Sequence, residues 1–182
     1  MGRRTLNRND YFEAGLELLA AGGVAEQTIA KLCERLSITK GSFYHHFTSL
    51  GDFRQQLLAY WEANHEAKMD DAEPNVVEWV APPASSVDAA VRAWGQSDEA
   101  AAAAQERVDA LRIKVATRDL RAAGVNADRA KGLSTLGLAI QIGVEAAGES
   151  WDRKTRKGIV EEFQRAVEAA GGSARPPVKR KA

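Results

Sequence analysis

A short segment in the first third of the chain carries side chains that suit contact with a nucleic acid. Lys40 supplies a positive charge, and the hydroxyls of Thr39 and Ser42 are short donors for phosphates or base edges. Tyr44 and His45 follow directly, and both can donate hydrogen bonds to phosphate. These residue types in this order predict a surface that binds DNA.

Other residues of the same segment predict a helix with one buried side. Ile38, Phe43 and Phe47 supply an inward-facing apolar group. Gly41 removes a side chain at a point where the backbone would approach DNA closely. Since Thr39 can cap this helix and a short break separates it from a preceding helix, the segment is a candidate helix-turn-helix.

Apolar periodicity predicts helices along most of the chain. They are expected over residues 11–21, 28–36, 39–44, 49–69, 86–95, 98–104, 106–122, 127–148 and 153–170. Residues 70–83 contain three prolines and are expected to form a loop or a broken helix. No segment alternates apolar and polar residues over the length of a strand, so the sequence predicts an all-α fold.

Composition excludes several classes of protein. Hydrophobic residues make up 45% of the chain and charged residues 27%, as in ordinary soluble domains. The single cysteine, Cys33, excludes an intramolecular disulfide and a multi-cysteine zinc site. No signal sequence and no bilayer-spanning apolar segment is evident, so we expect a cytoplasmic protein with no membrane partner.

The net charge of zero, from 25 basic and 25 acidic residues, does not exclude DNA as a partner. Residues 1–68 hold eight of each kind, but Arg3, Arg4 and Arg8 all lead the first helix. Residues 173–182 hold four basic residues and no acidic ones, and are expected to be disordered. We therefore expect few phosphate contacts and a shallow dependence of DNA affinity on salt.

A longer motif surrounds the candidate helix-turn-helix. It comprises Thr28-Ile29-Ala30-x-Leu32 and Ile38-Thr39-Lys40-Gly41-Ser42-Phe43-Tyr44-x-His46-Phe47. This motif resembles the DNA-binding domain of TetR-type (tetracycline-repressor-like) transcriptional regulators. The resemblance implies that the residues in contact with DNA are Thr28, Thr39, Lys40, Gly41, Ser42, Tyr44 and His45.

The resemblance also implies the organisation of the whole chain. A three-helix helix-turn-helix head (residues 1–49) would be joined by a long fourth helix to a C-terminal ligand-binding and dimerisation bundle (residues 50–172), followed by the basic tail. Two residues depart from the family pattern. Ser37 stands where glycine is usual in the turn, so the turn must tolerate a side chain. Leu50 stands where a lysine is typical, so one phosphate contact is expected to be lost.

The segment from Gly132 to Gly148 is apolar or small around most of a helical circumference, so it needs partners on two sides. With the next helix it suits the four-helix dimer interface of TetR-type proteins. The interface is predicted to contain Leu133, Gly137, Ile140, Gly143, Val144, Ala147, Ile159, Phe163 and Ala166. A monomeric bundle that buries both sides internally is the alternative.

A ligand pocket is expected from the resemblance, and the sequence offers candidates for its wall. These are Trp61, Trp79, Trp94, Leu111, Val115, Leu136 and Ile140, each of which is alternatively a plain core residue. Such a lining would favour an apolar or aromatic ligand. Asp109 and Arg112 either pair with each other or anchor a polar part of the ligand.

These features predict a sequence-specific DNA-binding regulator. We expect a homodimeric repressor that a small-molecule effector, of unknown identity, releases from a palindromic operator in double-stranded DNA. The alternative is a dimeric helix-turn-helix DNA-binding protein with no small-molecule effector, constitutive or controlled by a protein partner. No phosphate-binding glycine loop and no serine elbow is present, so no enzyme, cofactor or metal site is expected.

Overall fold

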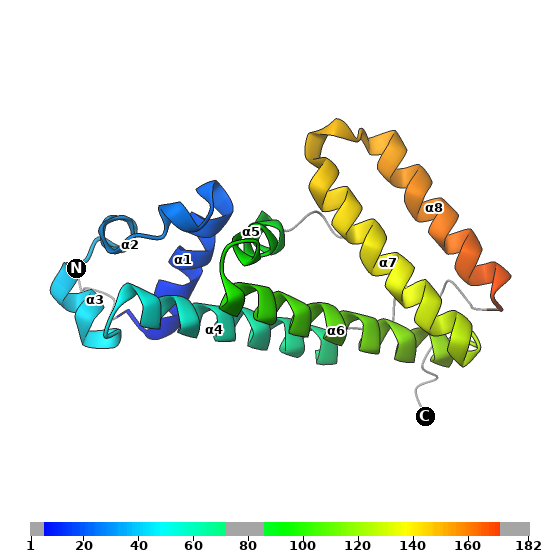
Figure 1. Ribbon diagram of the computed structural model, residues 1–182, viewed down its shortest axis with the longest axis horizontal. Coiled ribbons are helices and arrows are strands. Elements are labelled where there is room, and N and C mark those ends of the chain that lie inside the picture. Colours follow the sequence, from blue (N-terminus) through cyan, green and yellow to red (C-terminus); the bar gives the residue numbers. More distant parts are fainter. Residues whose placement is uncertain (1–5, 72–85, 172–182) are drawn as a thin grey trace, which may run out of the picture. The chain divides into compact units, whose positions relative to one another are not determined.

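The computed structural model describes residues 6–71 and 86–171, and this part of the chain is entirely helical (Figure 1). The elements are α1 (Arg8–Gly22), η1 (Val24–Glu26), α2 (Ile29–Leu36), α3 (Lys40–His46), α4 (Leu50–Asp71), α5 (Ser86–Gly95), α6 (Glu99–Ala122), α7 (Ala127–Ala147), η2 (Gly148–Ser150) and α8 (Arg153–Ala169). The all-α prediction is confirmed. None of the helices described is long and apolar enough to cross a membrane.

Side-chain caps explain where several helices begin. The Asn7 side chain accepts hydrogen bonds from the backbone N–H groups of Asn9 and Asp10, and the Asp10 carboxylate accepts one from the Asn7 N–H, which completes a capping box before α1. Thr28 and Thr39 cap α2 and α3 by accepting hydrogen bonds from the backbone N–H groups of Lys31 and Ser42, respectively. In the same way Asn126 and Asp152 cap α7 and α8, with the N–H groups of Arg129 and Thr155 as donors.

The prediction of two helices over 98–104 and 106–122 is wrong, because α6 is one helix of 24 residues. No glycine or proline interrupts it, and Gln105, placed at the predicted break, is buried as part of the helix. The predicted loop at 70–83 overlaps α4, which continues to Asp71. The rest of that segment, with Trp79, and the tail 173–182 lie outside the described residues.

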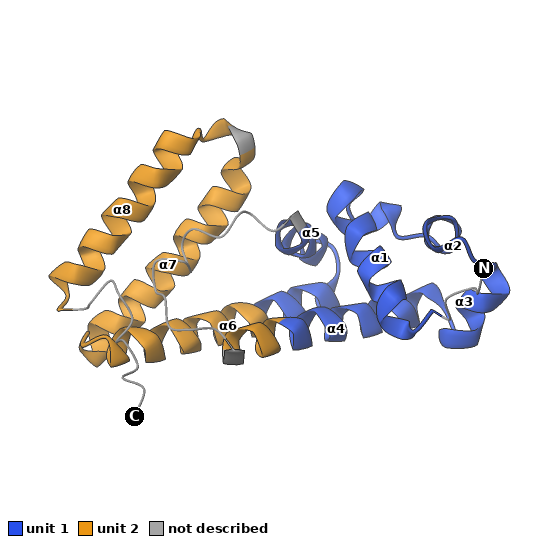
Figure 2. Cartoon of the chain, turned by 180° about the vertical axis from the view of Figure 1, so that it is seen from behind, with its two compact units in different colours: residues 1–64, 86–106 blue, residues 65–85, 107–182 orange. Residues whose placement is uncertain are grey.

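The chain divides into two compact units (Figure 2). The first comprises residues 1–64 and 86–106, and the second comprises residues 65–85 and 107–182. Both α4 and α6 contribute residues to each unit. The expected boundary after residue 49 marks the end of the helix-turn-helix, and it stays a prediction.

An aromatic core holds the first unit together. Tyr11, Phe43, Phe47 and Phe53 are each at most 1% exposed, and their rings meet at centroid distances of 5.1 to 6.5 Å. Gly15 lies where α1 meets α4, and a Cβ there would come within 2.6 Å of the Phe53 ring. The close approach of these two helices therefore requires a residue without a side chain.

The second unit has its own core, formed where the end of α6 meets α7 and α8. Its buried residues are Leu120, Val125, Ala130, Leu133, Phe163 and Val167. Thr117 on α6 donates a hydrogen bond of 2.9 Å to Ser134 on α7, whose hydroxyl donates in turn to the Ala130 carbonyl. These polar side chains thereby enter the interior with their hydrogen bonds made.

Candidate nucleic-acid interface

The turn between α2 and α3 accommodates a side chain, as the sequence predicted. Ser37 has a φ of +54°, in the left-handed region that favours glycine. Its backbone N–H donates to the Glu34 carbonyl, and the N–H of Ile38 donates to the Cys33 carbonyl. The turn is thus closed by the hydrogen bonds typical of a helix end, with an exposed serine in place of glycine.

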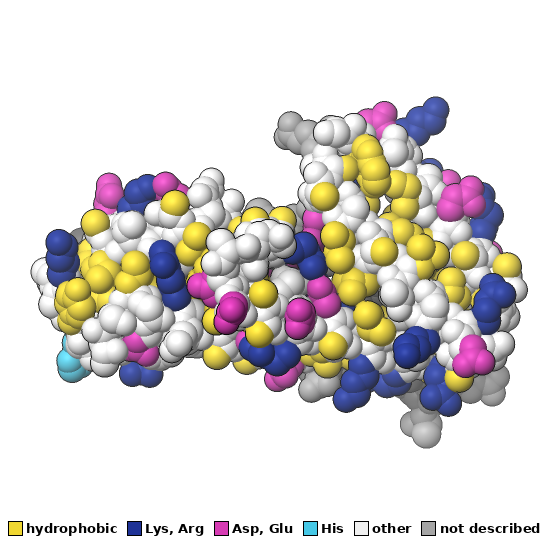
Figure 3. All heavy atoms as spheres, in the orientation of Figure 1, with side chains coloured by type: hydrophobic (Ala, Val, Ile, Leu, Met, Phe, Trp, Pro, Cys, Tyr) yellow, Lys and Arg dark blue, Asp and Glu magenta, His cyan; other side chains and the backbone are white. Residues whose placement is uncertain are grey.

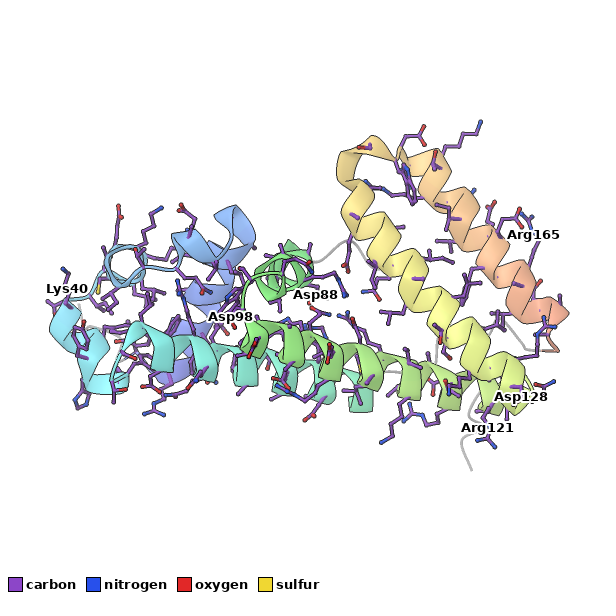
Figure 4. All side chains as sticks on the ribbon, viewed as in Figure 1. Lys40, Asp88, Asp98, Arg121, Asp128 and Arg165 are labelled. Atoms are coloured by element: carbon purple, nitrogen blue, oxygen red, sulfur yellow. The ribbon has the colours of Figure 1, made fainter. Side chains whose placement is uncertain are left out.

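Helix α3 has one buried side and one exposed side. Phe43 on its inner side is fully buried. Lys40, Tyr44 and His45 are exposed on the other side, Tyr44 by 55%. Figure 4 labels Lys40, which is the first residue of α3. An exposed cation, phenol and imidazole on one short helix form a group of donors that fits a phosphate backbone.

The three aliphatic hydroxyls of the predicted interface differ in their surroundings. Those of Thr28 and Thr39 each accept a capping hydrogen bond of 3.2 Å from the backbone, which leaves their protons available for donation to phosphate. Ser42 is half-buried, and its Oγ lies 3.1 Å from the hydroxyl of Tyr11 on α1. The structure therefore directs Ser42 toward α1.

Gly41 has no role in the packing that the structure shows. It is exposed, and a Cβ built there would meet only Thr39 Oγ1, at an ordinary contact distance of 3.7 Å. Nothing within the described chain requires a glycine here, and the missing side chain leaves clearance on the outer side of α3.

His46 is half-buried at the end of α3. Its ring lies 4.9 Å from the Tyr11 ring, measured between centroids. Burial, followed by the nearby charges of His45 and Arg8, lowers the pKa of His46 below its ordinary value of 6.5. The neutral imidazole is therefore the favoured form in the folded head.

Two arginines of this unit have structural contacts that the sequence did not reveal. Arg8 donates to Gln56 and to the His46 carbonyl, each at 3.1 Å. Arg54 on α4 donates to the backbone carbonyls of Val24 and Gln27, at 3.0 and 3.1 Å, just before the cap of α2. Both contacts join segments that are far apart in sequence, so no local pattern announces them.

The start of α4 fits the predicted loss of a cation. Leu50 is half-buried against the aromatic core. Beside it, the Ser49 hydroxyl accepts a hydrogen bond from the Asp52 N–H, and Asp52 accepts from the backbone N–H of Thr48. The hydrogen bond from Gln56, followed by the one from the Thr48 N–H, lowers the pKa of Asp52. The helix begins on a polar cap with an apolar anchor.

Cys33 lies on the inner side of α2 and is 8% exposed. Burial raises the pKa of its thiol, against a smaller opposite effect of Lys40. The protonated thiol belongs to the core of the first unit. Among the described residues, no group of three His, Cys, Asp or Glu side chains is placed to hold a metal ion.

The residues predicted to line a ligand pocket belong to both compact units. Trp61 and Trp94 are buried in the first unit, where Trp61 donates to Asp88 at 3.1 Å and the Arg54 guanidinium lies 6.0 Å from the Trp94 ring. In the second unit Val115 is buried and Leu111 half-buried, while Leu136 is 47% exposed.

The residues predicted at a dimer interface form two groups. Leu133, Gly137 and Phe163 are buried within the chain itself. The others are half-buried: Ile140, Gly143, Val144, Ala147, Ile159 and Ala166. Leu136, Ile140, Ile159 and Ala166 line a groove of about 450 Å³ between α7 and α8. Figure 3 shows hydrophobic side chains gathered at the surface over α7 and the adjoining part of α8.

Comparison with known proteins places this geometry in a family context. Residues 12–53 match the profile of bacterial regulatory proteins of the tetR family. That range runs from α1 to the start of α4 and includes the helix-turn-helix. No curated protein sequence matches the chain.

Several solved structures share the fold over most of the chain. A candidate TetR-type regulator of Streptomyces avermitilis has a TM-score of 0.67 at 20% identity, with 93% of this chain and 100% of that chain covered. A transcriptional regulator of Rhodococcus sp. Rha1 has a TM-score of 0.66 at 12% identity, with 94% and 100% covered. A candidate regulator of Saccharomonospora viridis, in complex with choline, has a TM-score of 0.65 at 17% identity, with 88% and 95% covered.

Proposed function

Residues 12–53 of this chain are a domain of the tetR family of bacterial regulatory proteins, and from this premise we propose a ligand-released, homodimeric transcriptional repressor. The observation that carries the proposal is the exposed side of α3. Lys40, Tyr44 and His45 are exposed there, and Gly41 leaves the backbone open to close approach. Such a surface suits a recognition helix in the major groove.

Selection from a random-sequence duplex pool tests the DNA-binding part of the proposal. The full chain is expected to enrich a palindrome, because a two-fold dimer presents the same helix to two half-sites. Footprinting should then show protection on both half-sites. Enrichment of no sequence would refute the proposed function.

A second copy of the chain is the proposed partner of the groove between α7 and α8. Leu136 leaves nearly half of its surface exposed beside half-buried Ile140 and Ile159. An apolar face of this kind is costly to leave in water and is typical of an oligomer interface. Sedimentation of the chain at micromolar concentration is expected to give the mass of a dimer.

A small molecule bound in the second unit is the proposed effector. Two polar side-chain pairs lie in the interior of this unit. Arg112, 6% exposed, approaches Asp109 at 3.4 Å, and Gln141, 9% exposed, donates to Glu145 at 3.2 Å. Buried polar groups of this kind give a binding site its specificity, and the choline complex of the Saccharomonospora viridis structure shows a small ligand on this fold.

Thermal-shift measurement with choline and a panel of small aromatic and aliphatic compounds tests for an effector. A compound that binds the folded chain is expected to raise the unfolding temperature as its concentration rises. The same compound should lower the affinity for the selected palindrome by the same coupling. Binding of a compound without any change in DNA affinity would favour the alternative of a regulator without a small-molecule effector.

A further inference from the structure

Arg8, at the start of α1, contacts both α3 and α4. Its Nη2 donates to the carbonyl of His46, the last residue of α3, at 3.1 Å. Its Nη1 donates to Gln56 Oε1 on α4, also at 3.1 Å. The guanidinium carbon lies 5.8 Å from the centre of the Phe47 ring. One side chain thus connects α1 with both α3 and α4.

The hydrogen bond to the His46 carbonyl lies at the C-terminal end of α3, where a cationic donor stabilises a helix most. The last carbonyls of a helix have no partner within the helix and carry partial negative charge, so a guanidinium there is favourable. Helix α3 has only seven residues, so its orientation depends on its neighbours. Tyr11, one turn after Arg8 on α1, contacts Ser42 near the other end of α3.

The contact to Gln56 extends the connection to the start of α4. Gln56 Nε2 donates to Asp52 Oδ1 at 2.7 Å, and the other oxygen of Asp52 accepts the Thr48 N–H at 2.8 Å. Thr48 lies in the connection between α3 and α4. Hydrogen bonds therefore lead from α1 through Arg8 and Gln56 to the residues on either side of the turn that follows the recognition helix.

We propose that Arg8 is a positioning residue for DNA recognition, which fixes the orientation of α3 against α1 and α4. The inference rests on the proposed function. It differs from the expectation that an arginine at the start of the first helix contacts phosphate directly. The two roles require different chemistry, because a phosphate accepts a lysine as well as an arginine, whereas a bridge between two separate acceptors needs the planar fork of arginine.

The test compares Arg8→Lys with Arg8→Met on the selected palindrome and on random duplex DNA, over a range of salt concentrations. We expect both variants to lose roughly tenfold in affinity for the palindrome, as for a hydrogen bond to a charged group. Affinity for random DNA should change much less, and the salt slope of Arg8→Lys should equal that of the wild type. Near-wild-type binding by Arg8→Lys, with a salt slope shallower by about 1.8 for Arg8→Met (about 0.9 for each subunit of the proposed dimer), would instead identify a phosphate contact and overturn the proposal.

A double-mutant cycle with Gln56→Met tests the connection itself. Gln56→Met alone should also lower the ratio of palindrome affinity to random-DNA affinity, and the loss in the double variant with Arg8→Met should be smaller than the product of the two single losses. Independent losses would contradict the connection. Arg121→Met, at an exposed arginine in the last turn of α6, is the matched control and should bind as the wild type does.

The same experiments separate this inference from the function on which it rests. A wild-type chain that enriches no DNA refutes the proposed function, and the inference with it. A wild type that binds its palindrome while Arg8→Lys binds equally well refutes the positioning role alone. Circular dichroism of each variant at the assay temperature checks that the head is folded, so a loss of affinity reports recognition.

Discussion

At the scale of single residues, Gly41 is a position where the fold does not require glycine but close approach of DNA would. A Cβ at this position has room in the chain, and alanine favours a helix more than glycine does. We expect Gly41→Ala to leave the free energy of unfolding unchanged or to raise it by up to about 1 kcal/mol. Affinity for the palindrome should fall, because the methyl group occupies the clearance on the outer side of α3.

Urea unfolding and DNA titration of the same Gly41→Ala preparation provide both measurements. Loss of stability together with affinity would mean that the glycine serves the fold. Unchanged affinity would mean that DNA does not approach the backbone at this point.

His46 gives the head a pH dependence with a definite sign. Its pKa in the folded state lies below the ordinary 6.5, so the unfolded chain binds the proton more readily. Its contribution to stability is fully present above pH 6.5 and is lost as the pH falls toward the lowered folded value. Unfolding temperatures measured between pH 8 and pH 5 should decline less in His46→Gln than in the wild type; an equal decline would exclude His46 as its source.

The contrast between the residues of α3 and Arg8 shows what sequence can reveal about a site. Exposure of Lys40 and Tyr44 followed from the spacing of the apolar residues around them, since helical periodicity is a local property. Arg8 contacts residues 38 and 48 positions away, and no local pattern encodes such a pairing. For the same reason the sequence did not predict the contacts of Arg54 or the direction of the Ser42 hydroxyl, which also involve residues far away in sequence.

At the scale of elements, the turn between α2 and α3 includes a residue in an unfavourable conformation. Left-handed backbone costs a non-glycine residue about 1 kcal/mol. Ser37→Gly should therefore raise the free energy of unfolding by up to about this amount, reduced by the greater freedom of glycine in the unfolded chain. Urea unfolding checks the sign, and a decrease would mean that the serine side chain stabilises the turn.

Helix boundaries followed from the sequence where a cap or a glycine marked them, and not elsewhere. The expected helices 28–36, 39–44 and 127–148 begin within one residue of α2, α3 and α7, and each of these three helices has a side-chain cap. The predicted break inside α6 had no such residue, and the helix continues through it with Gln105 buried. The local pattern could not predict the tertiary packing that buries Gln105 on that side of the helix.

At the scale of the whole molecule, the groove between α7 and α8 carries the prediction about assembly. Leu136→Glu places a charge on the exposed apolar face, and we expect the dimer to dissociate at concentrations where the wild type remains associated. Sedimentation velocity measures this. Thr135→Glu, at the neighbouring exposed position on α7, is the control for charge alone and should remain dimeric. Equal behaviour of the two variants would exclude this groove as the interface.

The fact that α4 and α6 each supply residues to both compact units has a thermodynamic consequence. Where α4 crosses from residue 64 to 65, the last C=O groups of the first unit accept hydrogen bonds from N–H groups of the second unit, and the same holds at residues 106 and 107 in α6. Neither unit can melt without freeing backbone groups of the other. We therefore expect the two units to unfold together, although they are separate compact units by their internal contacts. Calorimetry should record a single heat-absorption peak, with a calorimetric enthalpy of unfolding equal to the van't Hoff enthalpy.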